Sequence, residues 1–370
     1  MTISKPYKKF LYFILLLLVL VGACRKDPKQ TDSETEKVSS GSSSTIKGFY
    51  LVNEGNMGSN KASLDYYDYT TGNYTRNLFG SVNPDVVLGL GDVANDVAIY
   101  GAKMYVVINN SNQVEVMNAR TAKHIKEISV PNGRYITFYQ NKAYITSYEG
   151  YVAVADTGTL TVEKTIKVGR QPEQLAVVNQ KLYVANSGGY DPANYEHTVS
   201  VINLSTQTVT KTIDVAINLD KVVADKYGDI YVTSRGNYYD ISPKLFVIDT
   251  QNDVVKKQFD IAAGGLTINQ DIAYLYTSSY NYNTGNSTIT YRMLNVKDET
   301  LLNQSFITDG TDQQIKTPYG IAVDPVSLDV YVTDARDYVS SGILYCFDKT
   351  GKKKWSVTTG DIPAHFAFLY

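Results

Sequence analysis

The chain has 370 residues, of which 43% are hydrophobic and 19% are charged, and its formal net charge is −2 at pH 7. This near balance excludes a chain-wide electrostatic attraction to nucleic acid or to anionic lipid. The aromatic residues are unevenly divided, with 31 tyrosines against 11 phenylalanines. Tyrosine suits both β-sheet packing and ligand contact, because its apolar ring ends in a polar hydroxyl.

The first 23 residues have the pattern of a signal peptide. Lys5, Lys8 and Lys9 precede an apolar run at 10–21, which is shorter than the roughly 20 residues of a membrane-spanning helix and has the length of a signal-peptide core. The segment then ends in Gly22-Ala23-Cys24, which is similar to the bacterial lipobox. We therefore expect residues 1–23 to be cleaved and Cys24 to be lipidated; an ordinary signal peptide is the alternative.

Residues 24–45 are predicted to form a flexible tether. The stretch 32–36 is acidic, and the stretch 39–44 is almost entirely serine. This composition lacks the apolar residues that a folded core needs. A flexible chain of this length spans on the order of 25 Å, so the tether would hold a folded domain, residues 46–370, away from a membrane.

A short strand that begins with tyrosine recurs along residues 46–370. Where the spacing is tightest it is roughly 40 residues, which is the period of a four-stranded propeller blade. We therefore expect an all-β fold, a seven-bladed β-propeller of four-stranded antiparallel blades; six or eight blades are the alternatives. The tyrosines that begin these strands are Tyr50, Tyr105, Tyr144, Tyr183, Tyr231, Tyr274 and Tyr331.

The two ends of the repeat predict how the ring closes. Residues 363–369 have the pattern of a blade's first strand, and no further strands follow them. The unit at Tyr50 lacks a first strand of its own. We expect the C-terminal strand to pair with residues 50–53 and so to complete the first blade, because an open ring would leave unpaired strand edges.

The repeat resembles the YncE-like or YVTN-repeat propeller family over about residues 46–370. The run Leu182-Tyr183-Val184-Ala185-Asn186, followed by Val199-Ser200-Val201-Ile202-Asn203, is close to the family pattern. This resemblance implies the propeller fold and says little about function, because function depends on sites that vary within one fold.

Long loops are expected on one face of the ring, where the second strand of each blade connects to the third and where one blade connects to the next. The expected long loops are 53–62, 186–198, 234–244, 278–287 and 334–342. These loops are rich in tyrosine and asparagine, which offer rigid contact area and adaptable hydrogen bonding. Simple decoration of a soluble surface is the alternative. The predicted ligand-binding residues are Asn53, Glu54, Tyr148, Asn186, Tyr190, Tyr195, Arg235, Tyr238, Tyr239, Tyr280, Tyr282, Tyr319, Arg336 and Tyr338.

Signals for catalysis, metals or cofactors are weak. The three histidines, His124, His197 and His365, have no metal-binding spacing; His124 is expected to be solvated on an outer strand, and His365 to face the central channel. Cys346 lies in a strand-like apolar run and is expected to be a buried small residue. We expect no enzyme activity, no metal and no cofactor, although a pair of loop carboxylates, from Glu54, Asp191, Asp240 and Asp334, remains an open alternative.

The lipobox, the tether and the tyrosine-rich propeller together resemble the BtuG-type cobalamin-binding surface lipoproteins of Bacteroidetes. This resemblance implies an outer-membrane lipoprotein, exposed at the cell surface, that binds cobalamin or another large polar-edged molecule. It also implies handover to a TonB-dependent outer-membrane transporter, with membrane contact through the lipid anchor only and no nucleic-acid partner. A propeller that binds or processes glycans is the alternative, since tyrosine surfaces suit sugars equally well.

Overall fold

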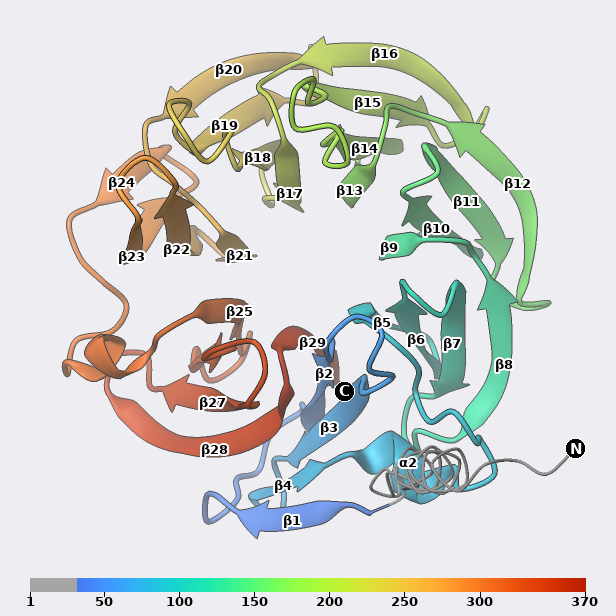
Figure 1. The fold of residues 1–370 in the computed structure, drawn as a ribbon, viewed down its shortest axis with the longest axis vertical. Helices are drawn as coiled ribbons and strands as arrows, with labels where there is room; N and C mark the ends of the chain where they lie inside the picture. Colours follow the sequence, from blue (N-terminus) through green and yellow to red (C-terminus); the bar gives the residue numbers. More distant parts are fainter. Residues whose placement is uncertain (1–31) are drawn as a thin grey trace, which may run out of the picture. The chain divides into compact units, whose positions relative to one another are not determined.

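The computed structural model describes residues 32–370, apart from the side chains of Ser279 and Asn286. These residues form seven antiparallel sheets around a central axis (Figure 1). The fold is an all-β, seven-bladed propeller, as the repeat predicts, and six or eight blades are excluded. The predicted signal peptide at 1–23 and the predicted lipidation site, Cys24, lie outside the described residues.

Each blade has four strands that run in order from the central axis to the rim. The innermost strands surround the axis in Figure 1 and are β29 (Pro363–Leu369), β5 (Ala94–Tyr100), β9 (Gly133–Tyr139), β13 (Pro172–Val178), β17 (Leu219–Ala224), β21 (Gly265–Asn269) and β25 (Pro318–Val323), in blades 1 to 7. The second strands are β2 (Gly48–Asn53), β6 (Lys103–Ile108), β10 (Lys142–Ser147), β14 (Lys181–Asn186), β18 (Asp229–Ser234), β22 (Ile272–Asn281) and β26 (Val330–Asp334).

The third and fourth strands complete the blades. The third strands are β3 (Ser63–Asp68), β7 (Gln113–Asn118), β11 (Tyr151–Asp156), β15 (Thr198–Asn203), β19 (Lys244–Asp249), β23 (Asn286–Asn295) and β27 (Ser341–Phe347). The outer strands are β4 (Asn73–Arg76), β8 (His124–Ser129), β12 (Thr161–Lys167), β16 (Thr208–Asp214), β20 (Val254–Phe259), β24 (Thr300–Leu302) and β28 (Lys353–Asp361). Most outer strands are exposed and carry lysines, which block pairing with the edges of other molecules.

The ring closes through its two ends. β29 pairs antiparallel with β2, so that Leu369 lies opposite Gly48 and His365 lies opposite Val52. The predicted closure is therefore confirmed. The last strand of the chain supplies the innermost strand of blade 1, and the core of that blade contains side chains from both ends of the domain.

The predicted tether is wrong for the residues just before the ring. A fifth strand, β1 (Glu34–Lys37), pairs antiparallel with β4 at the rim of blade 1. Thr35 and Thr75 share a hydrogen bond of 3.0 Å between their hydroxyls, and the backbone N–H groups of Val38 and Ser39 donate to the carbonyl of Gly72. These exposed residues are ordered without a core of their own, because the unpaired edge of β4 supplies hydrogen-bond partners.

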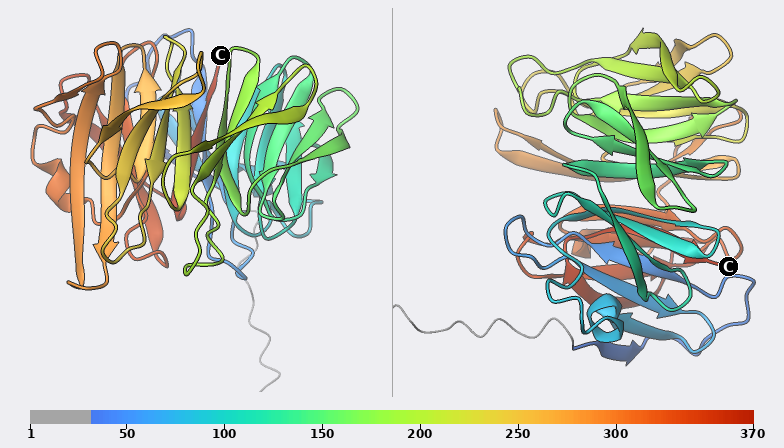
Figure 2. Two further views of the ribbon diagram at one scale, coloured as in Figure 1. Left: turned by 90° about the horizontal axis from the view of Figure 1, so that it is seen from above. Right: turned by 90° about the vertical axis from the view of Figure 1, so that its right-hand side faces the viewer.

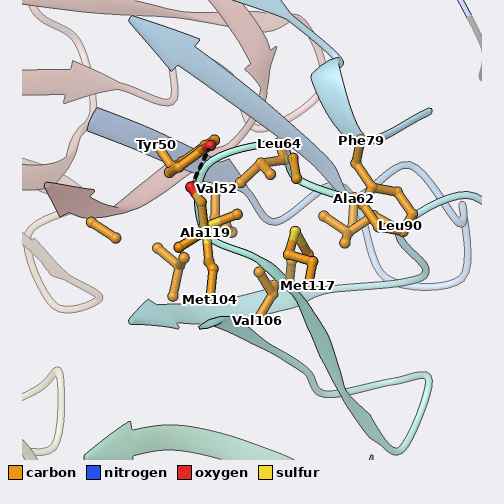
Figure 3. Close-up of a cluster of buried hydrophobic side chains, with 14 of the residues drawn as sticks. Tyr50, Val52, Ala62, Leu64, Phe79, Leu90, Met104, Val106, Met117 and Ala119 are labelled. Atoms are coloured by element: carbon orange, nitrogen blue, oxygen red, sulfur yellow. Dashed lines mark hydrogen bonds between the residues drawn. The ribbon is translucent and has the colours of Figure 1, made fainter. Parts of the chain in front are cut away.

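The repeated tyrosines hold neighbouring blades together. Tyr50 is buried between blades 1 and 2, and its hydroxyl donates to the carbonyl of Ala119 at 2.8 Å (Figure 3). Tyr183 and Tyr231 make the same kind of bond to the carbonyls of Thr250 and Val296, each in the next blade. In these three blades the tyrosine of the repeat combines apolar burial with a hydrogen bond to the following blade, whereas the buried hydroxyl of Tyr105 has no hydrogen-bond partner among the described residues.

The loops differ between the two ends of the ring. We call the end at which the second strands finish the loop face; it carries the connections 54–62, 77–93, 187–197, 235–243 and 335–340, together with helix α2 (Leu78–Val82). The prediction of a long loop at 278–287 is wrong, because β22 and β23, of ten residues each, extend into a hairpin that projects from the ring (Figure 2). A 3-10 turn, η1 (Thr311–Gln314), precedes blade 7.

No helix within residues 32–370 has the length and apolar character needed to cross a membrane.

Candidate ligand-binding site

A cavity of about 430 Å³ lies where the central axis meets the loop face. Its floor consists of residues from the innermost strands, and its walls come from the loops and strand ends of blades 5, 6 and 7. A volume of this size is in the range that holds a substantial part of a small-molecule ligand. The lining therefore defines a candidate binding site rather than a surface groove.

Irregular pairing at the start of the innermost strands places polar side chains in this floor. The ladder of β13 skips from Pro172 to Leu175, that of β17 from Leu219 to Val222, and that of β25 from Pro318 to Ile321. Such bulges turn side chains out of the regular alternation. The skipped residues are Glu173 and Gln174, Asp220 and Lys221, and Tyr319 and Gly320.

Glu173 is the centre of the floor's main charge cluster. It is fully buried and accepts hydrogen bonds from Arg134 at 3.1 Å, from Arg235 at 3.0 Å and from the hydroxyl of Tyr148. Burial alone would raise the pKa of Glu173, but Arg134 and Arg235 outweigh it and hold the pKa at about 2. This carboxylate therefore stays charged and fixes both arginines beneath the cavity.

Lys221 forms a second charged group in the floor. Its ammonium donates to the hydroxyl of Tyr135 at 2.8 Å and lies 3.7 Å from Asp220. Arg235 lies 2.9 Å from the same carboxylate oxygen of Asp220. Burial lowers the pKa of Lys221, but Asp220 and Tyr135 raise it by more, so the lysine remains protonated.

On the opposite side of the floor, burial favours the neutral forms of the ionisable groups. Burial raises the pKa of Glu54, which accepts a hydrogen bond of 2.9 Å from Tyr319. Burial also raises the pKa of Asp96 to about 7 and lowers that of His365, whose Nδ1 lies 3.7 Å from the Asp96 carboxylate. The floor thus combines a charged half with a half that can offer protonated carboxyl groups and a neutral imidazole.

Tyrosines form the outer wall and divide the first cavity from a second one. The second cavity, of about 380 Å³, lies between the 235–243 loop and the β22–β23 hairpin, and it shares Tyr238 and Tyr280 with the first. Tyr239 and Tyr282 stack with ring centroids 5.3 Å apart, and Tyr280 meets Tyr282 edge-on at 4.9 Å. The side chain of Arg292 lines the same cavity. The two cavities therefore lie side by side, with aromatic side chains between them.

Most of the predicted binding residues are brought together. Tyr148 and Tyr282 contact lining residues without lining the first cavity themselves: Arg134 lies 4.5 Å from the ring centre of Tyr148, and Tyr282 packs against Tyr280. Tyr195 lies close enough to Arg235 and Tyr238 for their charges to affect its pKa. Tyr239 lines the second cavity. The predicted residues that line the first cavity are Glu54, Arg235, Tyr238, Tyr280, Tyr319 and Tyr338.

Four predicted residues lie elsewhere. Asn53 and Asn186 are fully buried at the ends of second strands, where their amides donate to Ser63 and to Thr198 at 3.0 Å, so their placement in a binding surface is wrong. At the end of a second strand, a buried amide satisfies its hydrogen bonds within the blade and does not face the solvent. Arg336 is exposed and lines neither cavity, and Tyr190 is 67% exposed against the edge of Tyr148.

The sequence analysis missed the floor itself, namely Asp96, Arg134, Tyr135, Glu173, Asp220 and Lys221. The sequence does contain a sign of these residues: they are polar or charged at the second and third positions of the innermost strands, where a buried strand is expected to be apolar. An alignment of the repeats on the first residues of these strands, such as Gly133, Pro172 and Leu219, shows this pattern.

The remaining predictions for single residues are confirmed. Cys346 is buried, as expected. His365 lines the first cavity at the floor of the central axis, also as expected. His124 is exposed on the outer strand β8, as expected, and its Nδ1 also lies 2.7 Å from the buried carboxylate of Glu115, whose pKa burial raises to about 7. Within residues 32–370, no cluster of three or more histidine, cysteine, aspartate or glutamate side chains has the arrangement of a metal site.

Fold and site together define the class of the protein: a seven-bladed β-propeller with a polar, tyrosine-walled pocket at one mouth of its central axis. Residues 47–368 match the family DUF5074, which is described as a domain of unknown function, and the chain belongs to that family. No curated protein matches the sequence.

Solved structures share the fold at low sequence identity. A quinonprotein alcohol dehydrogenase-like protein from Bacteroides thetaiotaomicron has a TM-score of 0.60 and 17% identity, over 87% of this chain and 78% of that one. The hydrazine synthase of Kuenenia stuttgartiensis has a TM-score of 0.57 and 16% identity, over 69% and 76%. The WD40 domain of Neurospora crassa Pan2 has a TM-score of 0.53 and 10% identity, over 74% and 78%. At these identities the similarity concerns the fold alone.

Proposed function

We propose that this protein captures a large, polar-edged small molecule at the loop face, and that this ligand is cobalamin or a related corrinoid. The observation that carries the proposal is the adjacency of the two cavities, which have Tyr238 and Tyr280 in both linings. A broad ring with a rim of amides needs aromatic faces for its flat parts and fixed charges or hydroxyls for its edge. The tyrosine wall and the charged floor supply both kinds of partner.

The state of the acidic side chains supports binding rather than catalysis. Glu173 forms ion pairs with Arg134 and Arg235, and Asp220 forms ion pairs with Arg235 and Lys221. A hydrolase of the paired-carboxylate type needs two carboxyl groups that face one reacting bond. Of the acids expected as a pair, Glu54 lines the first cavity and accepts a hydrogen bond from Tyr319. Asp191, Asp240 and Asp334 line neither cavity, so none of them faces Glu54 across it, and Asp334 is buried and accepts hydrogen bonds from backbone N–H groups. We therefore propose that the protein is not an enzyme.

The cellular setting of the proposal comes from the sequence. Lipidation at Cys24 would attach the propeller to the outer membrane, with the head exposed at the cell surface. A captured corrinoid would then pass to a TonB-dependent transporter, which is the partner that the BtuG-type resemblance implies. No nucleic-acid partner is proposed, because the charges of the chain are nearly balanced.

A glycan is the second candidate ligand, and one observation favours it. Tyr239 and Tyr282 stack on each other and remain 54% and 61% exposed. Exposed aromatic faces of this kind fit the apolar face of a sugar ring. Such a ligand would use the second cavity and the hairpin and would make little use of the charged floor.

Calorimetry of the full chain carrying Cys24→Ser tests the choice between these ligands. We expect saturable binding of cyanocobalamin with nanomolar or tighter affinity, about −12 kcal/mol, since a surface scavenger collects a scarce nutrient. A panel of oligosaccharides should give no heat. Binding of an oligosaccharide without binding of cyanocobalamin would replace the corrinoid with the glycan, and heat from neither would reject both ligands.

A further inference from the structure

The four most exposed large apolar side chains of the described residues are aliphatic and lie on one face. Val87 is 90% exposed, Met57 72%, Leu88 71% and Val339 71%, and the next in rank is Tyr190 at 67%. All four belong to connections of the loop face, at 54–62, 77–93 and 335–340. Contiguous exposed apolar surface on a soluble head marks an interaction site more often than isolated residues do.

Hydrogen bonds hold these three connections together. The side chain of Asn60 donates to the carbonyl of Leu88 at 2.9 Å, and the backbone N–H of Gly58 donates to Asp92 at 2.7 Å. The side chain of Asn56 donates to the carbonyl of Tyr338 on the third connection. Met57, Val87, Leu88 and Val339 therefore form one feature at the junction of blades 7, 1 and 2, which we call the apolar corner.

The chain joins the ring beside this corner, on the same face. In the pairing of β1 with β4, Glu34 lies opposite Arg76 and Lys37 lies opposite Asn73. Arg76 is the end of β4 that leads into α2 and the 77–93 connection, so β1 starts at the loop face and runs away from it. The side chain of Asn77 also donates to the carbonyl of Asp32 at 3.0 Å. Figure 1 shows β1 at the rim next to β4, with α2 close by.

The short distance in sequence between Cys24 and β1 limits where a membrane can lie. Glu34 follows Cys24 by ten positions, and ten Cα steps span at most about 35 Å when fully extended. A lipid group at Cys24 would therefore keep the bilayer within that distance of Glu34, on the same face as the apolar corner. Such a lipid group fixes one point of the chain at the bilayer but not the orientation of the propeller, which a second attachment through the protein surface would set.

We propose that the apolar corner is this second attachment and inserts Met57, Val87, Leu88 and Val339 into the lipid surface that carries the anchor. The inference rests on the proposed lipidation of Cys24 and deepens the proposed function, because it turns the loop face, and with it the ligand cavity, toward the membrane. The ligand would then be held close to a membrane-embedded acceptor.

The shape and charge of the corner favour lipid over a protein partner. The four side chains stand on separate loop tips, and none of them lines either ligand cavity or the smaller cavity on the opposite face. The exposed charges of the segments 55–61, 83–91 and 335–340 cancel: Lys61 and Arg336 against Asp85 and Asp337. Protruding apolar tips without net charge suit a soft, neutral interface, whereas a protein partner requires a large complementary surface.

A thiol-attached fluorophore tests the insertion directly. Val87→Cys in the lipidated full chain offers one reactive thiol among the described residues, because Cys346 is only 1% exposed. A polarity-sensitive label there should shift to the blue when the protein is reconstituted into vesicles of phosphatidylethanolamine and phosphatidylglycerol. The matched control is Thr121→Cys, in the exposed β7–β8 turn on the opposite face, where the label should not shift.

A flotation assay of unlipidated protein measures the contribution of the corner alone. Residues 25–370, which lack the signal peptide and the lipidated cysteine, should float weakly with the same vesicles, and Met57→Ser, Val87→Ser, Leu88→Ser and Val339→Ser together should reduce the partition by about tenfold or more, because four aliphatic groups no longer leave water. A matched set on the outer strands, Ile125→Ser, Val162→Ser, Val209→Ser and Val254→Ser, should have little effect.

Several results would overturn the inference. A protein that floats while its label at position 87 stays in water shows that the corner does not insert, and equal shifts at 87 and 121 show that no face is preferred. A shift without lipid that grows with protein concentration assigns the corner to a second copy of the chain. A shift that requires added outer-membrane protein assigns it to a protein partner. Failure of the chain with Cys24 intact to float rejects the anchor and this inference together, whereas cyanocobalamin calorimetry separately decides the proposed ligand.

Discussion

Two populations of tyrosine in this propeller have opposite surroundings. The tyrosines of the second strands, such as Tyr50, Tyr183 and Tyr231, are at most 1% exposed, and their hydroxyls donate to carbonyls of the next blade. The tyrosines of the loop face, such as Tyr239 and Tyr282, are mostly exposed and pack on one another. The tyrosines of the first population recur at one position in each repeat, whereas those of the second lie between repeated strands. A tyrosine at the repeated position therefore stabilises the ring, and a tyrosine outside it is available to bind a ligand.

The largest expected effect concerns the first population. Tyr50→Ala removes a buried ring between blades 1 and 2 and should lower the free energy of unfolding by about 3–5 kcal/mol. Tyr50→Phe keeps the ring and removes only the bond to Ala119, so it should cost about 1 kcal/mol. Urea unfolding measures both variants. Equal losses for the two would mean that the hydrogen bond, and not the packing, carries the stability.

The second prediction concerns Glu173, which holds the binding floor in place. The pKa of Glu173 in the folded protein is about 2, below its ordinary value of 4.5, so its stabilisation is present above pH 4.5 and is lost as the pH falls toward 2. Glu173→Gln should lower the free energy of unfolding at pH 7 by about 3 kcal/mol, because Arg134 and Arg235 lose their buried counter-charge.

Unfolding at pH 7 and at pH 3 checks this prediction, with the exposed Glu127→Gln on β8 as the control. The difference in stability between Glu173→Gln and the unchanged protein should shrink at the lower pH. A difference that stays constant between the two pH values would show that the charge of Glu173 is not what holds the arginines.

The third prediction concerns the second population. Tyr238→Ala with Tyr280→Ala should weaken cyanocobalamin binding by about 2 kcal/mol or more, because both side chains line both cavities. The same pair should change the free energy of unfolding by much less than Tyr50→Ala, since these rings lie outside the blade cores. Calorimetry and urea unfolding of one preparation measure both. A large loss of stability with unchanged affinity would show that Tyr238 and Tyr280 stabilise the ring, as Tyr50 does, and do not bind the ligand.

The smallest expected effect concerns Asp96, beside His365 beneath the cavity. Burial raises the pKa of Asp96 to about 7, so its favourable contribution is complete below its ordinary pKa of 3.8 and is lost as the pH rises through 7. Asp96→Asn keeps an acceptor for the N–H of Ile136 and removes the ionisation. It should raise the free energy of unfolding at pH 8 by about 1 kcal/mol and leave it nearly unchanged at pH 4. An unchanged free energy of unfolding of Asp96→Asn at pH 8 would contradict the raised pKa of Asp96, because ionisation of this carboxyl would then cost the folded state nothing.

The fold was predictable because its signal is repeated. The tyrosine at the start of each second strand, the lysine-rich outer strands and the unpaired strands at both ends all predict one ring. The strand β1 was not predictable, because its exposed residues Glu34 to Lys37 have no apolar pattern and depend on the edge of β4 for their order. The hairpin of β22 and β23 was likewise hidden, since its turn sequence resembles that of a loop.

The binding site was only half predictable, for a related reason. Loop tyrosines such as Tyr238 and Tyr280 stand out in the sequence because they interrupt the repeat, and they line the cavity. The charged floor is built from residues far apart in the chain, as with Arg134, Glu173 and Arg235. Bulges at the start of β9 and β13 turn Arg134 and Glu173 out of the regular alternation, and Arg235 reaches Glu173 from the connection after β18. Sequence periodicity reports neither the bulges nor this contact.

Nitration of tyrosines by tetranitromethane, with and without saturating cyanocobalamin and with sites identified by mass spectrometry, tests the contrast and the proposed ligand in one measurement. Tyr239, Tyr280, Tyr282 and Tyr338 are between 41% and 61% exposed and should react without the ligand. The buried Tyr50, Tyr183 and Tyr231 should react in neither condition. We predict that cyanocobalamin protects the loop-face set several-fold, and equal reactivity of that set with and without the ligand would contradict the proposal that this face binds a corrinoid.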